Sequence, residues 1–176
     1  MEQYRKSPRA KWIEYNEGIY FITICTLHKK HYFGEIANAE MRLSSIGEFV
    51  YNELENVTQR HEHISIPQFV VMPNHIHAVV VIDTPTHQRC VPTCDERVER
   101  CITSKQRPLL SAYVGMLKSV VTKYARKIGV PFAWQSRYHD HAIRGIYDGN
   151  RISEYIDNNI LRWDMDCFND ENSAPK

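Results

Sequence analysis

Two histidines one residue apart have the clearest chemical potential in this chain. His75 and His77 lie in the run 69–82, whose other residues are largely the β-branched and apolar types of a buried strand. Because successive side chains of a strand alternate between its faces, both imidazoles project to one side, and Ile76 and Ala78 enter the core. Neutral imidazole is the commonest protein ligand for metal ions, so the pair predicts a divalent cation site.

A second pair of residues could complete such a site. Tyr155 and Asn159 are four positions apart in a segment that reads as a helix, and therefore share one helix face. The Asn159 amide would be the third ligand of a neutral His-His-Asn shell, which leaves the full double charge of the ion available to a substrate. Free tyrosine has a pKa of about 10, so Tyr155 would need that cation beside it to act as a nucleophile.

The whole chain limits what can hold these residues. Its 176 residues suit one domain, and 43% hydrophobic and 24% charged residues are ordinary globular values. The net charge of +1 excludes a uniformly basic surface but not a local basic patch. No apolar run approaches the roughly 20 residues of a membrane span and no signal peptide is evident, so we expect a cytoplasmic protein with no membrane partner.

Periodicity predicts the elements that position the site. Strands are expected at 18–26, 64–73 and 75–82, with extended structure at 132–144. Helices are expected from Ser44 and Ser45 to about Gln59, over 109–128 before Gly129, and over about 150–163. This order predicts an α+β fold, a ferredoxin-like antiparallel sheet with helices packed on it, as a single domain over 1–176. Residues 84–107 are expected to be a flexible insertion and 164–176 an acidic tail.

The five cysteines do not suggest a disulfide framework, because their number is odd and no secretory signal precedes them. Three of them, with one histidine, fall in the expected insertion and could in principle bind zinc: His87, Cys90, Cys94 and Cys101. Their spacings do not match the common paired-cysteine patterns, so reduced thiols are the expectation.

Two longer motifs resemble a known family. The run Met72-Pro73-Asn74-His75-Ile76-His77 resembles the HUH motif (His, bulky apolar, His) of single-tyrosine transposases. The run 134–144, Trp-Gln-Ser-Arg-Tyr-His-Asp-His-Ala-Ile-Arg, followed by Tyr155 and Asn159, is similar to the REP-associated tyrosine transposase branch of that superfamily. The resemblance extends from the first strand to Trp163 and is weakest over 84–107.

This resemblance implies a ferredoxin-like nuclease domain that binds single-stranded DNA with hairpin elements, at a REP-like or insertion-sequence end. It implies that His75, His77 and Asn159 hold Mg²⁺ or Mn²⁺, and that Tyr155 attacks a DNA phosphate to give a 5′-phosphotyrosine bond and a free 3′-OH. Phenolate leaves more readily than a sugar alkoxide, so such a bond suits strand transfer. Members of the family are monomers or homodimers that share active sites, and either state is open here.

Several residues are candidate DNA contacts. Trp134 and Tyr138 could stack on unpaired bases, although aromatic side chains of this kind also pack in cores. Arg137 and Arg144 could contact phosphates, with ordinary surface charge as the equal alternative. The predicted helix over 109–128 adds basic residues on its outer face, among them Lys118 and Lys123.

Alternatives remain for both site and function. His139 and His141 form a second alternating pair that could hold the metal or orient its ligands, and Tyr138 is the reserve nucleophile. A histidine-triad hydrolase would need a histidine where Val79 stands. A rolling-circle replication or relaxase-type HUH nuclease shares the histidine pair and the tyrosine, and the run 134–144 favours the transposase branch over it. The remaining alternative is a non-catalytic DNA-binding module.

Overall fold

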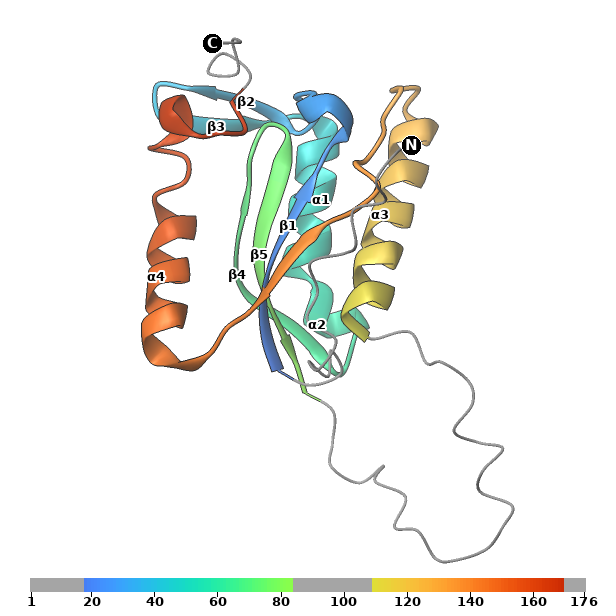
Figure 1. The fold of residues 1–176 in the computed structure, drawn as a ribbon. Coiled ribbons are helices and arrows are strands. Elements are labelled where there is room, and N and C mark those ends of the chain that lie inside the picture. Colours follow the sequence, from blue (N-terminus) through green and yellow to red (C-terminus); the bar gives the residue numbers. More distant parts are fainter. Residues whose placement is uncertain (1–17, 84–108, 170–176) are drawn as a thin grey trace, which may run out of the picture.

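The computed structural model describes residues 18–83 and 109–169 (Figure 1). Their central element is a four-stranded sheet with the order β4-β5-β1-β6, in which every neighbouring pair is antiparallel. Its strands are β1 (Gly18–Cys25), β4 (Ile64–Val71), β5 (His75–Ile82) and β6 (His139–Ala142). This order, with a helix between β1 and β4 and another between β5 and β6, is that of a ferredoxin-like fold. The predicted α+β class is confirmed.

Helices cover both faces of the sheet. The helices α1 (Ser45–Glu55) and α3 (Leu109–Lys127) lie on one face, and the short α2 (Val57–Arg60) follows α1. On the opposite face lies α4 (Gly145–Asp157), shown in orange-red at the left of Figure 1. None of the described helices is long and apolar enough to cross a bilayer.

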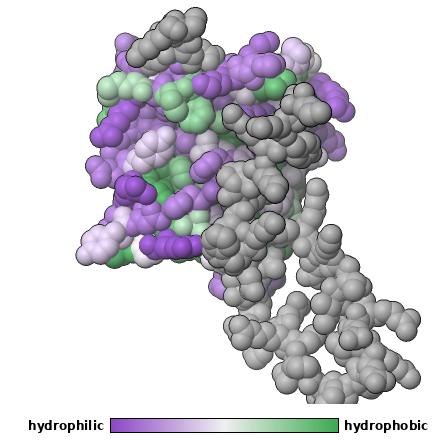
Figure 2. All heavy atoms as spheres, viewed as in Figure 1, coloured by the Kyte–Doolittle hydropathy of each residue, from purple (hydrophilic) through white to green (hydrophobic). Residues whose placement is uncertain are grey.

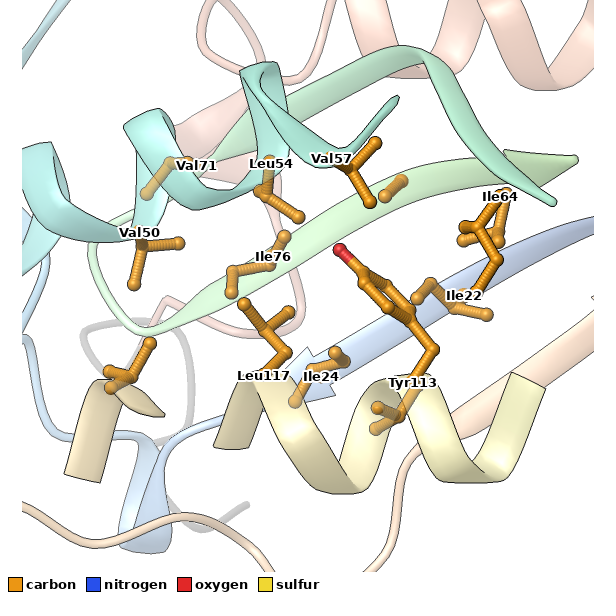
Figure 3. Close-up of a cluster of buried hydrophobic side chains, with 14 of the residues drawn as sticks. Ile22, Ile24, Val50, Leu54, Val57, Ile64, Val71, Ile76, Tyr113 and Leu117 are labelled. Atoms are coloured by element: carbon orange, nitrogen blue, oxygen red, sulfur yellow. The ribbon is translucent and has the colours of Figure 1, made fainter. Parts of the chain in front are cut away.

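The main core lies between the sheet and the pair α1 and α3. Ile22 and Ile24 of β1 and Ile76 of β5 lie in one cluster with Leu54 and Leu117 of the two helices (Figure 3). All five side chains are buried, and burying one such side chain contributes about 1.5–3 kcal/mol. A smaller cluster on the other face attaches α4 through Val79, Ile152 and Ile156. The nucleophile candidate is therefore carried by a helix with a core of its own.

Two predicted helices differ at their ends. The first begins where expected, because the Ser44 hydroxyl caps it by accepting a hydrogen bond from the Gly47 amide at 3.1 Å, but it breaks at Asn56 into α1 and α2. The last helix starts at Gly145 and ends at Asp157 instead of spanning about 150–163. Beyond it the chain turns, and a short 3₁₀ helix, η4 (Trp163–Met165), follows.

A hairpin was not predicted. Strands β2 (Gly34–Ala37) and β3 (Glu40–Leu43) pair outside the main sheet, joined by Asn38 and Ala39. Both turn residues have positive φ, 55° and 60°, as a tight hairpin turn requires. No sequence pattern indicates this hairpin, because its strands are only four residues long and alanine rarely occupies a left-handed position. The predicted extended run 132–144 likewise forms only β6 and an isolated bridge between Thr26 and Trp134.

The visible surface is mostly polar. In the space-filling view, hydrophilic residues cover most of the described face and smaller apolar areas lie between them (Figure 2). The expected insertion 84–107, with its cysteines and His87, lies outside the described residues, as do residues 170–176.

Candidate active site

Strand register collects the candidate residues on the α4 side of the sheet. Thr23 of β1 pairs with His77 on β5 and with His139 on β6, so the three side chains form a row across three strands. One alternate position along β1, Cys25 pairs with His75. Because side chains alternate along each strand, these residues all leave the same face.

His75 and His77 are both buried, with ring centroids 4.5 Å apart. Ile76 and Ala78 between and beside them lie fully buried in the core on the opposite face. Burial lowers the pKa of His77 to about 3, with a smaller contribution from His139. Burial also lowers the pKa of His75 well below 6.5, helped by His77. Both imidazoles are therefore neutral at pH 7, which is the form that binds metals.

Tyr155 reaches the same point from α4. Its hydroxyl lies 3.2 Å from His77 Nε2, and its ring meets the rings of His77 and Phe21 edge-on at centroid distances of 5.1 and 6.1 Å. The side chain remains 39% exposed. Burial raises the pKa of Tyr155, although a hydrogen bond from Asn159 lowers it. Because its pKa is raised, the Tyr155 hydroxyl is a neutral phenol, which lies between the His77 imidazole and the Asn159 amide.

Asn159 lies just past the end of α4, because the C-cap is Asn158. The expected shared helix face is therefore replaced by a turn, in which the Asn159 amide N–H donates to the carbonyl of Ile156 at 3.2 Å. This turn still places the Asn159 side chain against the Tyr155 hydroxyl. The side chain is only 2% exposed.

Two buried polar atoms at this point have no hydrogen-bond partner among residues 18–83 and 109–169, His75 Nε2 and Asn159 Oδ1. Buried polar atoms without partners are rare, and each calls for a physical explanation. Both atoms are of types that bind metal ions and belong to residues predicted as metal ligands. His77 Nε2, which contacts the Tyr155 hydroxyl, belongs to the third predicted ligand. The donor set fits a divalent cation. Histidine, cysteine and acidic side chains alone form no three-member cluster in the described parts.

Tyr155 stands where two cavities meet. A cleft of about 890 Å³ is lined by Thr23, His77 and Tyr155 together with Phe21, Cys25, Gln135, Arg137, Tyr138, His139 and Phe168. A neighbouring pocket of about 370 Å³ shares Phe21, His139 and Tyr155 and adds His141, Arg151 and Ile152. A substrate in the cleft would therefore contact the tyrosine and the histidine face together.

Sequence comparison places the chain in a family. An uncharacterized protein of Haemophilus influenzae is 34% identical over 165 residues, which are 93% of this chain and 92% of that protein. The chain belongs to the same family as this Haemophilus protein. No family model matches it.

Structural comparison shows the fold. The structure of a REP-associated tyrosine transposase bound to a REP hairpin aligns over 90% of this chain and 74% of that chain, with a TM-score of 0.52 and 17% identity. The resemblance drawn from the two motifs is thus confirmed for the fold. A candidate transposase from Deinococcus radiodurans R1 aligns over 87% of this chain and 97% of that chain at 12% identity, with a TM-score of 0.46, too low to support a conclusion.

The predicted DNA contacts divide into two groups. Arg137 and Tyr138 line the cleft, and the Tyr138 hydroxyl is hydrogen-bonded to Ser111 at 3.0 Å. The other four residues do not line it. Lys123 and Arg144 are exposed on α3 and at the start of α4, and the Lys118 ammonium donates to the Gln135 carbonyl at 2.7 Å. The fourth is Trp134.

Trp134 packs as a core residue. Its ring lies 4.9 Å from Phe132 and 5.5 Å from Phe33, centroid to centroid, and its Nε1–H donates to the Lys118 carbonyl at 3.1 Å. We expect Trp134→Ala to lower the free energy of unfolding by about 2–3 kcal/mol, because a half-buried aromatic ring and one hydrogen bond are lost. Urea unfolding measures this, with Lys123→Ala as the neutral control. Weaker DNA binding at unchanged stability would instead identify Trp134 as a stacking residue.

The rival histidine pair has a different environment. His139 and His141 are both exposed, and His141 Nε2 lies 2.7 Å from Asp148 Oδ2. This hydrogen bond lowers the pKa of Asp148, and the carboxylate also accepts from the Arg144 amide at 3.2 Å. His141 is thus tied to the start of α4, whereas His139 lines both cavities beside Tyr155.

Three residues beside the site were missed from the sequence. Thr23 Oγ1 lies 2.9 Å from His77 Nδ1, and Asn74 Oδ1 lies 2.8 Å from His75 Nδ1. The ring of Phe168, from the segment expected as an acidic tail, lies 4.5 Å from that of His75. Asn74 stood inside the quoted motif, where its turn propensity hid its side-chain role. To predict the positions of Thr23 and Phe168, one would have to know the strand register and the tertiary contacts.

The buried histidines predict a pH-dependent stability. Because the pKa of His77 falls from 6.5 to about 3 on folding, the unfolded chain binds more protons below pH 6.5. In metal-free protein the free energy of unfolding should be greatest above pH 6.5 and fall by about 1.4 kcal/mol per pH unit for each such histidine below it. Urea titrations between pH 7.5 and 4.5 in EDTA measure this. A slope unchanged in His77→Gln would contradict the assignment.

Proposed function

We propose that this protein is a metal-dependent single-stranded DNA endonuclease and strand transferase of the transposase type, with Tyr155 as its nucleophile. The observation that carries the proposal is the position of the Tyr155 hydroxyl, 3.2 Å from His77 Nε2 in a cleft. Beside it lie the unpartnered His75 Nε2 and Asn159 Oδ1. The fold, shared with a transposase bound to a REP hairpin, supports the same reaction class.

In this proposal His75, His77 and Asn159 hold Mg²⁺ or Mn²⁺. The ion would polarise the phosphate and favour the phenolate form of Tyr155, which burial otherwise opposes. The residues are suited to this because both imidazoles are neutral and the amide adds no charge. Phe21 packs edge-on against the Tyr155 ring and keeps its hydroxyl at the cleft.

The reaction exchanges one ester bond for another. The Tyr155 oxygen forms a bond to phosphorus and the bond from phosphorus to the 3′ oxygen breaks, which leaves a 5′-phosphotyrosine and a 3′-OH. The phenol loses one proton and the 3′ oxygen gains one, so no proton is consumed. Attack by another 3′-OH on the phosphotyrosine reverses the exchange and joins a new strand.

The cleft supports single-stranded DNA as the substrate. Its lining includes the aromatic rings of Phe21, Tyr138 and Phe168, and the cation of Arg137. Aromatic rings stack with unpaired bases whatever their sequence, whereas the bases of a duplex are already stacked on their neighbours. We propose a hairpin beside the cleaved strand, by analogy with the REP hairpin of the structural relative.

The test is covalent capture. Protein, Mn²⁺ and labelled single-stranded hairpin DNA, separated on a denaturing gel, should give a protein–DNA adduct that EDTA prevents. A fully paired duplex of the same sequence should give little adduct. Hairpin binding with no adduct at any divalent ion would indicate a non-catalytic DNA-binding module and refute the proposal. Sedimentation with and without the hairpin tests whether the active species is a homodimer.

A further inference from the structure

The side chain of Asn74 contacts the ring of His75, a ligand of the proposed metal site. We propose that Asn74 is a positioning residue, which fixes the ring tautomer of His75 so that Nε2 presents a lone pair. The backbone carbonyls of Lys29 and Phe168 hold the Asn74 amide in the orientation that this role requires. The inference deepens the proposed function, since it concerns the ligand atom of that site.

The Asn74 amide has one allowed orientation. The residue is fully buried, and its Nδ2 donates one hydrogen bond to the Lys29 carbonyl at 3.1 Å and another to the Phe168 carbonyl at 2.8 Å. Both amide hydrogens are therefore used. Rotating the amide by half a turn would place its oxygen against two carbonyl oxygens and lose both bonds. Asn74 Oδ1 consequently faces His75 Nδ1, at 2.8 Å.

This contact selects the tautomer. An amide oxygen only accepts hydrogen bonds, so the proton of neutral His75 lies on Nδ1 and the lone pair on Nε2. The other tautomer would leave Nδ1 and Oδ1 facing each other as two buried acceptors, at a cost of about 1–3 kcal/mol. Such a cost corresponds to a bias of about 5- to 140-fold at 1.4 kcal/mol per tenfold.

His77 lacks an equivalent control. Its Nδ1 partner is the Thr23 hydroxyl, which can either donate or accept a hydrogen bond. Its Nε2 partner, the Tyr155 hydroxyl, has the same freedom. The amide at position 74 is therefore the contact that dictates a tautomer in this pair of histidines.

The surroundings of Asn74 join segments that are distant in the sequence. Its own backbone carbonyl accepts hydrogen bonds from the Thr26 amide at 2.9 Å and the Thr26 hydroxyl at 3.0 Å. The Lys29 carbonyl belongs to a turn in which His28 and Lys29 have positive φ of 54° and 52°. The Lys29 ammonium in turn donates to the Cys167 carbonyl at 2.6 Å, next to Phe168. The turn and the C-terminal segment thus close on the amide from two sides.

The decisive experiment observes the tautomer in metal-free, DNA-free protein. Long-range ¹H–¹⁵N spectra of ¹⁵N-histidine-labelled protein at pH 7.5 should show His75 protonated on Nδ1. Asn74→Ala should lower the population of this tautomer and weaken Mn²⁺ binding, measured by calorimetry, by about 10- to 100-fold. Asn74→Leu, which keeps a similar volume but offers no acceptor toward His75, should have the same effect. Asn52→Ala, exposed on α1, is the control for an asparagine loss elsewhere.

Two results would overturn the inference. The first is a wild-type spectrum with His75 protonated on Nε2, a measurement that needs no variant and holds even if Asn74→Ala fails to fold. The second is a folded Asn74→Ala protein with unchanged tautomer and unchanged Mn²⁺ affinity. Failure of the proposed function gives a different pattern, because DNA adducts would be absent while the tautomer still responded to Asn74.

Discussion

Tyr155→Phe should abolish the covalent adduct with single-stranded hairpin DNA, lowering its rate of formation by at least about 1,000-fold. The substitution removes only the hydroxyl that lies 3.2 Å from His77 Nε2, and leaves the ring that packs against Phe21 and His77. Folding and DNA affinity should therefore stay close to wild type. Quantitative denaturing gels measure the adduct, and thermal unfolding reports the fold.

The same helix supplies the matched control. Tyr147 also lies in α4 but is 89% exposed and lines neither the cleft nor the neighbouring pocket, so Tyr147→Phe should form adduct at the wild-type rate. Tyr138 is the competing nucleophile, because it lines the cleft as well. An adduct that survives Tyr155→Phe and disappears in Tyr138→Phe would transfer the catalytic role to Tyr138.

Removing one imidazole of the buried pair should have the second large effect, on metal binding. His77→Gln should weaken Mn²⁺ binding by at least about 100-fold and prevent adduct formation. The flexible glutamine amide does not replace an imidazole nitrogen whose ring is fixed by its neighbours. Calorimetry on the DNA-free protein measures this independently of activity. His139→Gln, on the exposed β6 strand, is the control and should bind Mn²⁺ normally. The opposite result, loss in His139→Gln alone, would place the ion on β6.

The choice of variant matters at His75. Its place at the first residue of β5 suggests from sequence that alanine would spare the fold. In the structure its ring is fully buried and lies 4.5 Å from Phe168 and 6.1 Å from Trp163, centroid to centroid. His75→Ala would leave a cavity and cost about 2–4 kcal/mol of stability. A weaker metal affinity in that variant would then have two explanations, lost ligand and lost packing, whereas His77→Gln keeps most of the side-chain volume.

Local patterns predicted the parts of the molecule that local forces decide. Strand alternation gave the common direction of His75 and His77, and the Ser44 cap gave the start of α1. The turn after Asp157 was missed because the chain beyond it keeps polar and apolar residues at helical spacing. The partners of the imidazoles could not be predicted, since Thr23 is 54 residues from His77 and its contact depends on the pairing of β1 with β5.

Trp134 shows the converse limit. An aromatic residue in a motif that resembles one of DNA-processing enzymes suggests base stacking. In the structure, its ring is held by Phe33 and Phe132 and its Nε1–H by a backbone carbonyl. The residue type shows that the Trp134 ring can stack on a flat partner. The tertiary structure decides whether that partner is another side chain or a base.

The pairing of β1 with β5 determines what a misfolded form of this protein would lose. A shift of one residue along β5 would turn His75 and His77 into the apolar core and put Ile76 and Ala78 in the cleft, because the side-chain repeat of a strand is two. Two neutral imidazoles would then replace an isoleucine and an alanine among packed hydrophobic side chains. The register that places both imidazoles in the cleft is therefore the one that the core enforces, and a mispaired chain would lose the candidate site and its stability together.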